Sequence, residues 1–220
     1  RELRTTAYWL ALAPDTVETL RERGLWTNDP NDYGPNWAKQ RNAARRRDGY
    51  RCQMCGTPEH ERQHHVHHKL PFRQFLGYQQ ANQLSNLITL CPACHRRAEA
   101  AVQMRSGLSG LGTVLGHLAP LFLMCDSHDL GVHTDPQSSL VKGQPAIIIY
   151  EMIPAGIGFS EQLFELHQEL VVHAQQLVRD CSCAEGCPSC VGPAGESGRG
   201  GKAETLALLE RLVTVSQVVS

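Results

Sequence analysis

The chain has 220 residues, a formal net charge of −1 and 41% hydrophobic residues, so it is long enough to bury a sizeable core in one or two domains. It shows no secretory signal and no apolar run near the length of a membrane span, and we therefore expect a cytoplasmic protein with no membrane partner. It opens on Arg1 rather than on Met, which we interpret as a piece of a longer protein.

The small net charge hides a basic segment. Residues 37–99 hold eleven Lys or Arg against four Asp or Glu, whereas the rest of the chain holds ten against eighteen. Six of the eleven histidines lie in the same segment. A basic segment in an otherwise acidic chain predicts a polyanionic partner for that segment, and nucleic acid is the natural candidate.

The first elements precede this basic segment. Residues 2–12 are rich in β-branched and aromatic side chains and favour a strand. Residues 16–23 favour a short helix that Gly24 ends. Residues 27–36 are nearly all turn formers, so they favour a linker, and the abrupt change in composition after them indicates a domain boundary.

The later elements are mostly helical. A Gly-rich stretch at 106–112 is expected to separate two helices and to end the central module near residue 105. The continuous apolar run at 145–152 favours a buried strand, and a Gly-rich loop is expected at 192–201. Helices are predicted over residues 37–48, 96–103, 115–125, 160–179 and 203–218.

Eight of the nine cysteines occur in closely spaced pairs. Two C-x-x-C pairs can close a tetrahedral thiolate shell around one zinc ion, which predicts a structural site with no open position. Disulfides or free thiols are the alternative, but nothing in the sequence indicates secretion. The predicted ligands are Cys52, Cys55, Cys91 and Cys94 for a first zinc and Cys181, Cys183, Cys187 and Cys190 for a second. The ninth, Cys125, is expected to be a small core residue.

Histidines and an asparagine lie between and beside the first two pairs: His67-His68, Asn86 and His95. This arrangement resembles an HNH endonuclease module, and the resemblance implies a ββα-metal fold with a hairpin carrying the histidine pair. It also implies that His68 is the general base, that His67 and His95 bind a catalytic Mg or Mn ion, and that Asn86 fixes the hairpin and orients the base. The other histidines of the segment, His60, His64 and His65, have no counterpart and are expected to be solvated loop residues.

A second resemblance covers roughly residues 1–30 and 110–220. Its motifs are Leu121–Asp126, Asp129–Gly131, Tyr150–Gly158 and the second cysteine cluster, and together they resemble the MrfA-type zinc-binding domain. That domain usually forms the C-terminal part of superfamily 2 DNA helicases, with related versions in phage defence. We therefore expect an α+β chain in which an HNH module, residues 37–105, is inserted into a mixed α/β zinc-binding domain, residues 1–36 and 106–220.

The two resemblances imply a metal-dependent HNH endonuclease that hydrolyses DNA phosphodiester bonds, with helicase motor domains upstream and a role in DNA repair or phage defence. A non-catalytic, zinc-stabilised DNA-binding accessory of a helicase is the alternative, and RNA remains open as a substrate. In either case the run Arg45-Arg46-Arg47 is expected to contact phosphates, which would position the nucleic acid without reading its sequence.

Overall fold

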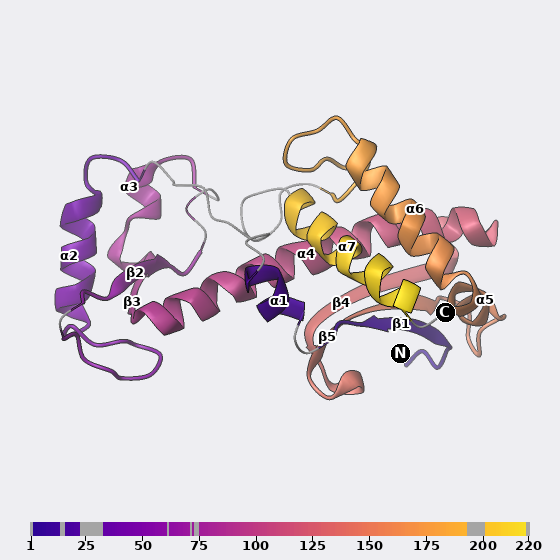
Figure 1. The fold of residues 1–220 in the computed structure, drawn as a ribbon, viewed down its shortest axis with the longest axis horizontal. Coiled ribbons are helices and arrows are strands. Elements are labelled where there is room, and N and C mark those ends of the chain that lie inside the picture. Colours follow the sequence, from indigo (N-terminus) through magenta and orange to yellow (C-terminus); the bar gives the residue numbers. More distant parts are fainter. Residues whose placement is uncertain are drawn as a thin grey trace. The chain divides into compact units, whose positions relative to one another are not determined.

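The computed structural model describes residues 2–13, 16–22, 33–60, 62–70, 72, 75–192 and 201–218. The chain divides into two compact units, drawn in Figure 1. Unit 1 contains the described residues of 1–26, 104–195 and 200–220, and unit 2 contains those of 27–103. The predicted domain boundaries at residues 36 and 105 stay predictions, and most of the predicted linker and of the loop at 192–201 lies outside the described residues.

Unit 1 is built on a three-stranded antiparallel sheet of order β1-β5-β4. The strands are β1 (Ala7–Ala11), β4 (Leu130–Ser138) and β5 (Gln144–Glu151). The apolar run predicted to be a buried strand forms the central strand β5, where Ile147 and Ile149 are buried. The sequence did not predict β4, because this edge strand is mostly polar and has a register shift next to Pro136.

Helices cover one face of the sheet in Figure 1. Alternate residues of β1, Tyr8 and Leu10, point to that face and join the core, while Trp9 between them is 54% exposed. The helices of unit 1 are α1 (Thr16–Glu22), the C-terminal part of α4 (Pro92–Leu123), α5 (Phe159–Glu165), α6 (His167–Asp180) and α7 (Lys202–Val218), with short 3₁₀ turns at Ser127–Asp129 and Ser139–Val141.

Helix α4 corrects the prediction of two helices separated by a Gly-rich stretch. The chain stays helical from Pro92 to Leu123. The glycines serve close packing instead, because a Cβ on Gly107 would lie 2.7 Å from Leu208, and one on Gly110 would overlap Thr205 of α7. Conversely, the single helix predicted at 160–179 is two helices that break at Leu166.

Helix α4 is also apolar enough to span a membrane by length and composition, contrary to the expectation of no such run. Its most apolar window has a mean hydropathy of 1.3, and 67% of that window is buried inside the protein. The core helix of a soluble protein passes the same test, so this is weak evidence for a membrane span.

Unit 2 consists of short elements around the first cysteine cluster. It contains α2 (Trp37–Arg47), β2 (His65–His68), α3 (Tyr78–Ala81), a 3₁₀ turn (Leu84–Asn86), β3 (Leu87–Leu90) and the start of α4. Strands β2 and β3 pair antiparallel, so the predicted hairpin is present. Its apolar clusters are small: one centres on Ala44, Val66 and Leu87, the other on Cys52, Leu90 and Cys94.

Glu151 is a fully buried carboxylate at the end of β5. Its oxygens accept hydrogen bonds from the Thr6 hydroxyl (2.6 Å) and from the backbone N–H groups of Ile157 (2.5 Å) and Ser160 (2.9 Å). Burial alone would raise the pKa of Glu151, but these hydrogen bonds outweigh it and lower the pKa to about 2. The motif Tyr150–Gly158 is therefore a turn folded around a buried charge.

We predict that Glu151→Gln destabilises unit 1 by about 3 kcal/mol at pH 7, because the depressed pKa corresponds to a stabilisation of that size. The folded-state pKa is lowered, so this contribution is present above pH 4.5 and is lost as the pH falls towards 2. Amide hydrogen exchange of β1 and β5 in urea measures unit 1 alone. The exposed Glu169→Gln is the matched control, and equal protection in both variants would contradict the assignment.

Candidate functional site

The first cysteine cluster lies where the chain enters and leaves the hairpin of unit 2. All four Sγ atoms lie within 4.8 Å of one another, and those of Cys55 and Cys91 are 3.7 Å apart. A disulfide requires about 2.05 Å, so these are free thiols arranged as a ligand set. A tight turn shapes the first pair, because Gly56 N–H donates to the Cys52 carbonyl at 2.8 Å.

The thiols of this cluster differ in acidity. A hydrogen bond from the Thr57 hydroxyl lowers the pKa of the exposed Cys55 to about 6, whereas burial raises the pKa of Cys94 to about 12. Four thiolates packed this closely repel one another, and a divalent cation removes that repulsion. The donor set therefore fits zinc, which thiolates bind tetrahedrally.

The second cluster lies in unit 1, after α6. Its four Sγ atoms also lie within 4.8 Å of one another, with 3.5 Å between Cys183 and Cys190. Lys202, the first residue of α7, donates through Nζ to the carbonyls of Cys181 (2.5 Å) and Cys183 (2.8 Å). These two hydrogen bonds tie α7 to the backbone of the cysteine cluster.

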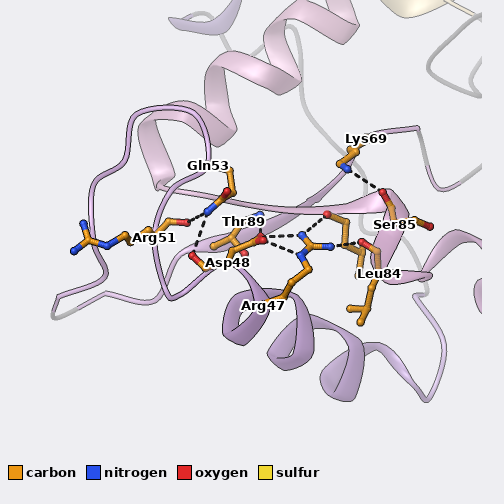
Figure 2. Close-up of polar contacts among 9 residues, drawn as sticks. Arg47, Asp48, Arg51, Gln53, Lys69, Leu84, Ser85 and Thr89 are labelled. Atoms are coloured by element: carbon orange, nitrogen blue, oxygen red, sulfur yellow. Dashed lines mark hydrogen bonds and ion pairs between the residues drawn. The ribbon is translucent and has the colours of Figure 1, made fainter.

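Figure 2 shows how α2 is tied to the hairpin. The Arg47 guanidinium bonds the Asp48 carboxylate at 2.8 and 2.9 Å and also donates to the carbonyls of Leu84 and Leu87. The Asp48 carboxylate accepts in turn from the backbone N–H of Thr89 in β3 at 2.9 Å. This network fixes the end of α2 against the start of β3.

The three arginines that are predicted to contact phosphates have different surroundings in the structure. Arg45 is only 7% exposed and forms a bidentate ion pair with Glu59 at 2.8 and 2.5 Å. Arg47 is engaged in the contacts just described. The buried Arg45 guanidinium cannot reach a phosphate without breaking its ion pair, whereas the Arg47 side chain is 37% exposed. Arg46 and Arg47 are exposed, and contact of the run with phosphates stays a prediction.

His68, the predicted general base, is 8% exposed and sits among aromatic rings. Its ring lies 5.3 Å from Tyr33 and 5.1 Å from Trp37, nearly parallel to both, and Phe72 approaches edge-on at 5.5 Å. Burial lowers the pKa of His68, which favours the neutral imidazole that a base requires.

Asn82, which the sequence reading missed, orients this ring. Its Oδ1 lies 3.0 Å from His68 Nε2, and its Nδ2 donates to the Tyr33 carbonyl and the Asn36 side chain, both at 2.8 Å. The two donations fix the amide orientation, so Oδ1 must accept and Nε2 must carry the proton. In the neutral imidazole the lone pair then lies on Nδ1.

Asn86, to which the resemblance assigns that orienting role, acts on the backbone instead. Its Oδ1 accepts from Leu70 N–H at 2.8 Å, and its Nδ2 donates to the carbonyls of Leu70 (3.2 Å) and Ala81 (2.9 Å). Asn86 thus fixes the segment that follows His68, as expected for the hairpin. The sequence marked Asn82 only as a second asparagine, four residues before Asn86.

His67 lies on the opposite face of β2 from His68, because neighbouring strand residues alternate. Its ring meets that of His95, in the first turn of α4, at 5.2 Å, and His95 Nδ1 lies 3.4 Å from a Glu99 carboxylate oxygen. Burial and the neighbouring His95 lower the pKa of His67 to about 4, so its imidazole is neutral and can donate a lone pair. Two imidazoles and a carboxylate fit a divalent metal ion.

The three histidines expected to be solvated loop residues divide in the structure. His60 is exposed, but His64 is 6% exposed, with Nε2 at 2.8 Å from the Thr57 carbonyl. His65 belongs to β2, and its ring lies 4.8 Å from that of His95. The expectation is therefore wrong for His64, which is buried, and His65 is exposed as expected but is the first residue of a strand rather than part of a loop.

Two protein families match separate parts of this chain. Residues 52–100 match the HNH endonuclease family, and residues 111–191 match the MrfA Zn-binding domain (MZB) family. Each match includes all four cysteines of one cluster, and together the two matches confirm the predicted fold class and both resemblances.

Two curated proteins and a solved structure are similar to parts of this chain. An uncharacterized ATP-dependent helicase, YprA of Bacillus subtilis (strain 168), is 36% identical over 48% of this chain and 14% of its own length. An uncharacterized protein of Methanocaldococcus jannaschii is 30% identical over 34% of this chain and 68% of its own length. The crystal structure of the DUF1998 helicase MrfA bound to DNA is 33% identical over 50% of this chain, with a TM-score of 0.46.

The chain spans 14% of the length of both helicases. Strand β1 precedes the HNH match in sequence and pairs with β5, which follows it. The HNH residues are therefore inserted between two paired strands of one sheet. The chain belongs to the MrfA-type zinc-binding domain family and carries an inserted HNH endonuclease-family module.

Proposed function

We propose that this chain is a metal-dependent endonuclease that hydrolyses DNA phosphodiester bonds through its HNH module. It would act as the C-terminal part of a helicase-like protein in DNA repair or phage defence, with motor domains upstream that deliver the DNA. One observation carries the proposal: an oriented, neutral His68 is adjacent in sequence to His67. The ring of His67 faces that of His95, which in turn lies beside the Glu99 carboxylate.

His68 is suited to take the proton from an attacking water. Asn82 holds Nε2–H, so Nδ1 carries the lone pair that accepts the proton. The rings of Tyr33 and Trp37 keep the imidazole in place and limit its rotation. Asn86 holds the backbone directly after the base, so that the nitrogen keeps its direction.

His67, His95 and Glu99 would hold a divalent ion, which we expect to be Mg or Mn. Such an ion, when bound, stabilises the charge that develops on the phosphate and on the leaving oxygen. The exposed Arg46 supports binding of the DNA backbone, since an arginine with its guanidinium in solvent can pair with a phosphate.

A non-catalytic DNA-binding accessory is the second candidate. It is favoured by the burial of His68, which is 8% exposed and lies on the other face of β2 from His67. In that case the histidines would only shape a zinc-stabilised surface. Cleavage by the isolated chain separates the two candidates.

We predict that the zinc-loaded protein cuts supercoiled plasmid when Mg or Mn is present, and that His68→Ala lowers the rate by about 10²–10⁴-fold, the usual contribution of a general base. His60→Ala, at an exposed histidine, should cut normally. Parallel assays on single-stranded DNA and RNA define the substrate. Undiminished cutting by the His68 variant, or no cutting by folded wild type with DNA binding retained, would favour the accessory.

Asn82→Ala is predicted to slow cleavage about fivefold, because one hydrogen bond of about 1 kcal/mol sets the tautomer. Nitrogen-15 NMR of the His68 ring should show Nε2–H in wild type and a mixture of tautomers in the variant. Asn36→Ala removes one acceptor of the Asn82 amide but leaves the bond to His68, so it serves as control. An unchanged tautomer in Asn82→Ala would contradict the assignment.

Two structural zinc ions are predicted per chain, one in each cysteine cluster. Cys94→Ser and Cys183→Ser should each leave one zinc, whereas Cys125→Ser, outside both clusters, should leave two. Because the apolar clusters of unit 2 are small, loss of the first zinc should also unfold the hairpin. Elemental analysis and amide exchange of β2 measure both effects, and a folded, zinc-free hairpin would contradict them.

A further inference from the structure

Three imidazoles gather where β2 meets the first turn of α4. His65 and His67 are two residues apart on β2, so both side chains point to the same face of the hairpin. The ring of His95 lies 4.8 Å from that of His65 and 5.2 Å from that of His67. His95 therefore stands between the two strand histidines, with Glu99 one helical turn beyond it.

His65 is the member of this group that neither the HNH resemblance nor the proposed mechanism uses. Three imidazoles at these separations cannot all carry a proton, because the positive charges would repel one another strongly. Imidazoles that stay neutral offer lone pairs, and neutral imidazole is the commonest metal ligand in proteins. A carboxylate beside three lone pairs completes a four-member donor set.

We propose that His65 joins His67, His95 and Glu99 in one divalent-metal site, and that this site prefers a first-row transition ion such as Co²⁺, Mn²⁺ or Zn²⁺ over Mg²⁺. The inference deepens the proposed function, on which it rests, by naming a further ligand and the class of ion. Mg²⁺ takes oxygen ligands and keeps much of its water, whereas imidazole nitrogen suits transition metals. Three nitrogens to one carboxylate favour the transition ion.

The histidine group is wider than the cysteine clusters. In the part of the chain that the structure describes, only the two cysteine clusters bring all their ligand atoms within 4.8 Å of one another. Closure around an ion therefore requires side-chain rotation. His65 is exposed and the Glu99 side chain is 32% exposed, so neither rotation disturbs a packed core. His67 is half-buried on the paired strand β2 and provides the fixed side of the site.

The test is metal binding to protein whose two cysteine clusters already contain zinc. Calorimetric titration with Co²⁺ should show one further equivalent in wild type, and His65→Ala should weaken its affinity at least about tenfold, the loss expected for one ligand. The absorption spectrum of the added Co²⁺ should contain d–d bands but no sulfur-to-metal charge-transfer band. The absence of that band shows that the ion is not in a cysteine cluster. His60→Ala, an exposed histidine of the same unit, is the matched control and should bind like wild type.

Three outcomes overturn the inference. The first is unchanged Co²⁺ affinity in His65→Ala, even if cleavage is lost, because His65 would then act on the substrate rather than on the ion. The second is tighter binding of Mg²⁺ than of Co²⁺ by wild type. The third is the absence of a further equivalent in a protein that retains two zinc ions. Binding that behaves as expected in a protein that does not cut DNA would instead reject the proposed function and leave the metal site standing.

Discussion

The backbone pairing of β1 with β5 is the constraint on which the organisation of this chain depends. Five residues near the N-terminus pair with the central strand of unit 1, and the whole HNH match lies between the two strands in sequence. The pairing closes a long loop at an entropy cost that grows only slowly with length. An inserted module of this size is therefore compatible with the sheet, provided that the paired strands are well buried.

Within unit 2, the two faces of strand β2 present different histidines to different neighbours. One face of β2 presents His65 and His67 to α4, and the other presents His68 to the aromatic rings and to Asn82. The strand holds both faces in register because Asn86 and the Arg47–Asp48 pair fasten the backbone around it. Asn82 and the residues that hold the backbone thus determine how these imidazoles are placed.

The sequence predicted the features that follow from local spacing. The paired cysteines and the apolar strand β5 are patterns among neighbours in the chain, and the structure contains both. The hairpin with its histidines is implied by the HNH resemblance, and it is present too. What the sequence missed depends on distant partners. The glycines of α4 looked like a break because the helix that packs against them lies about a hundred residues later.

The same limit applies to charged and polar side chains. Arg45 and Arg46 are adjacent and chemically identical, yet Glu59 buries one and leaves the other exposed. Spacing cannot reveal such a partner. Asn82 and Asn86 are likewise indistinguishable by type, and only the positions of Tyr33 and Leu70 show which amide bonds the ring and which the backbone.

The β1–β5 pairing also sets an order of events during synthesis. The described residues of unit 2 end at residue 103, whereas the strand that pairs with β1 ends at Glu151, about fifty residues later. At about 5–20 residues per second this leaves a few seconds in which the inserted module can close its thiol cluster while β1 has no strand to pair with. During that interval β1 still lacks its partner strand β5, so the inserted metal-binding module can fold before the sheet of its host.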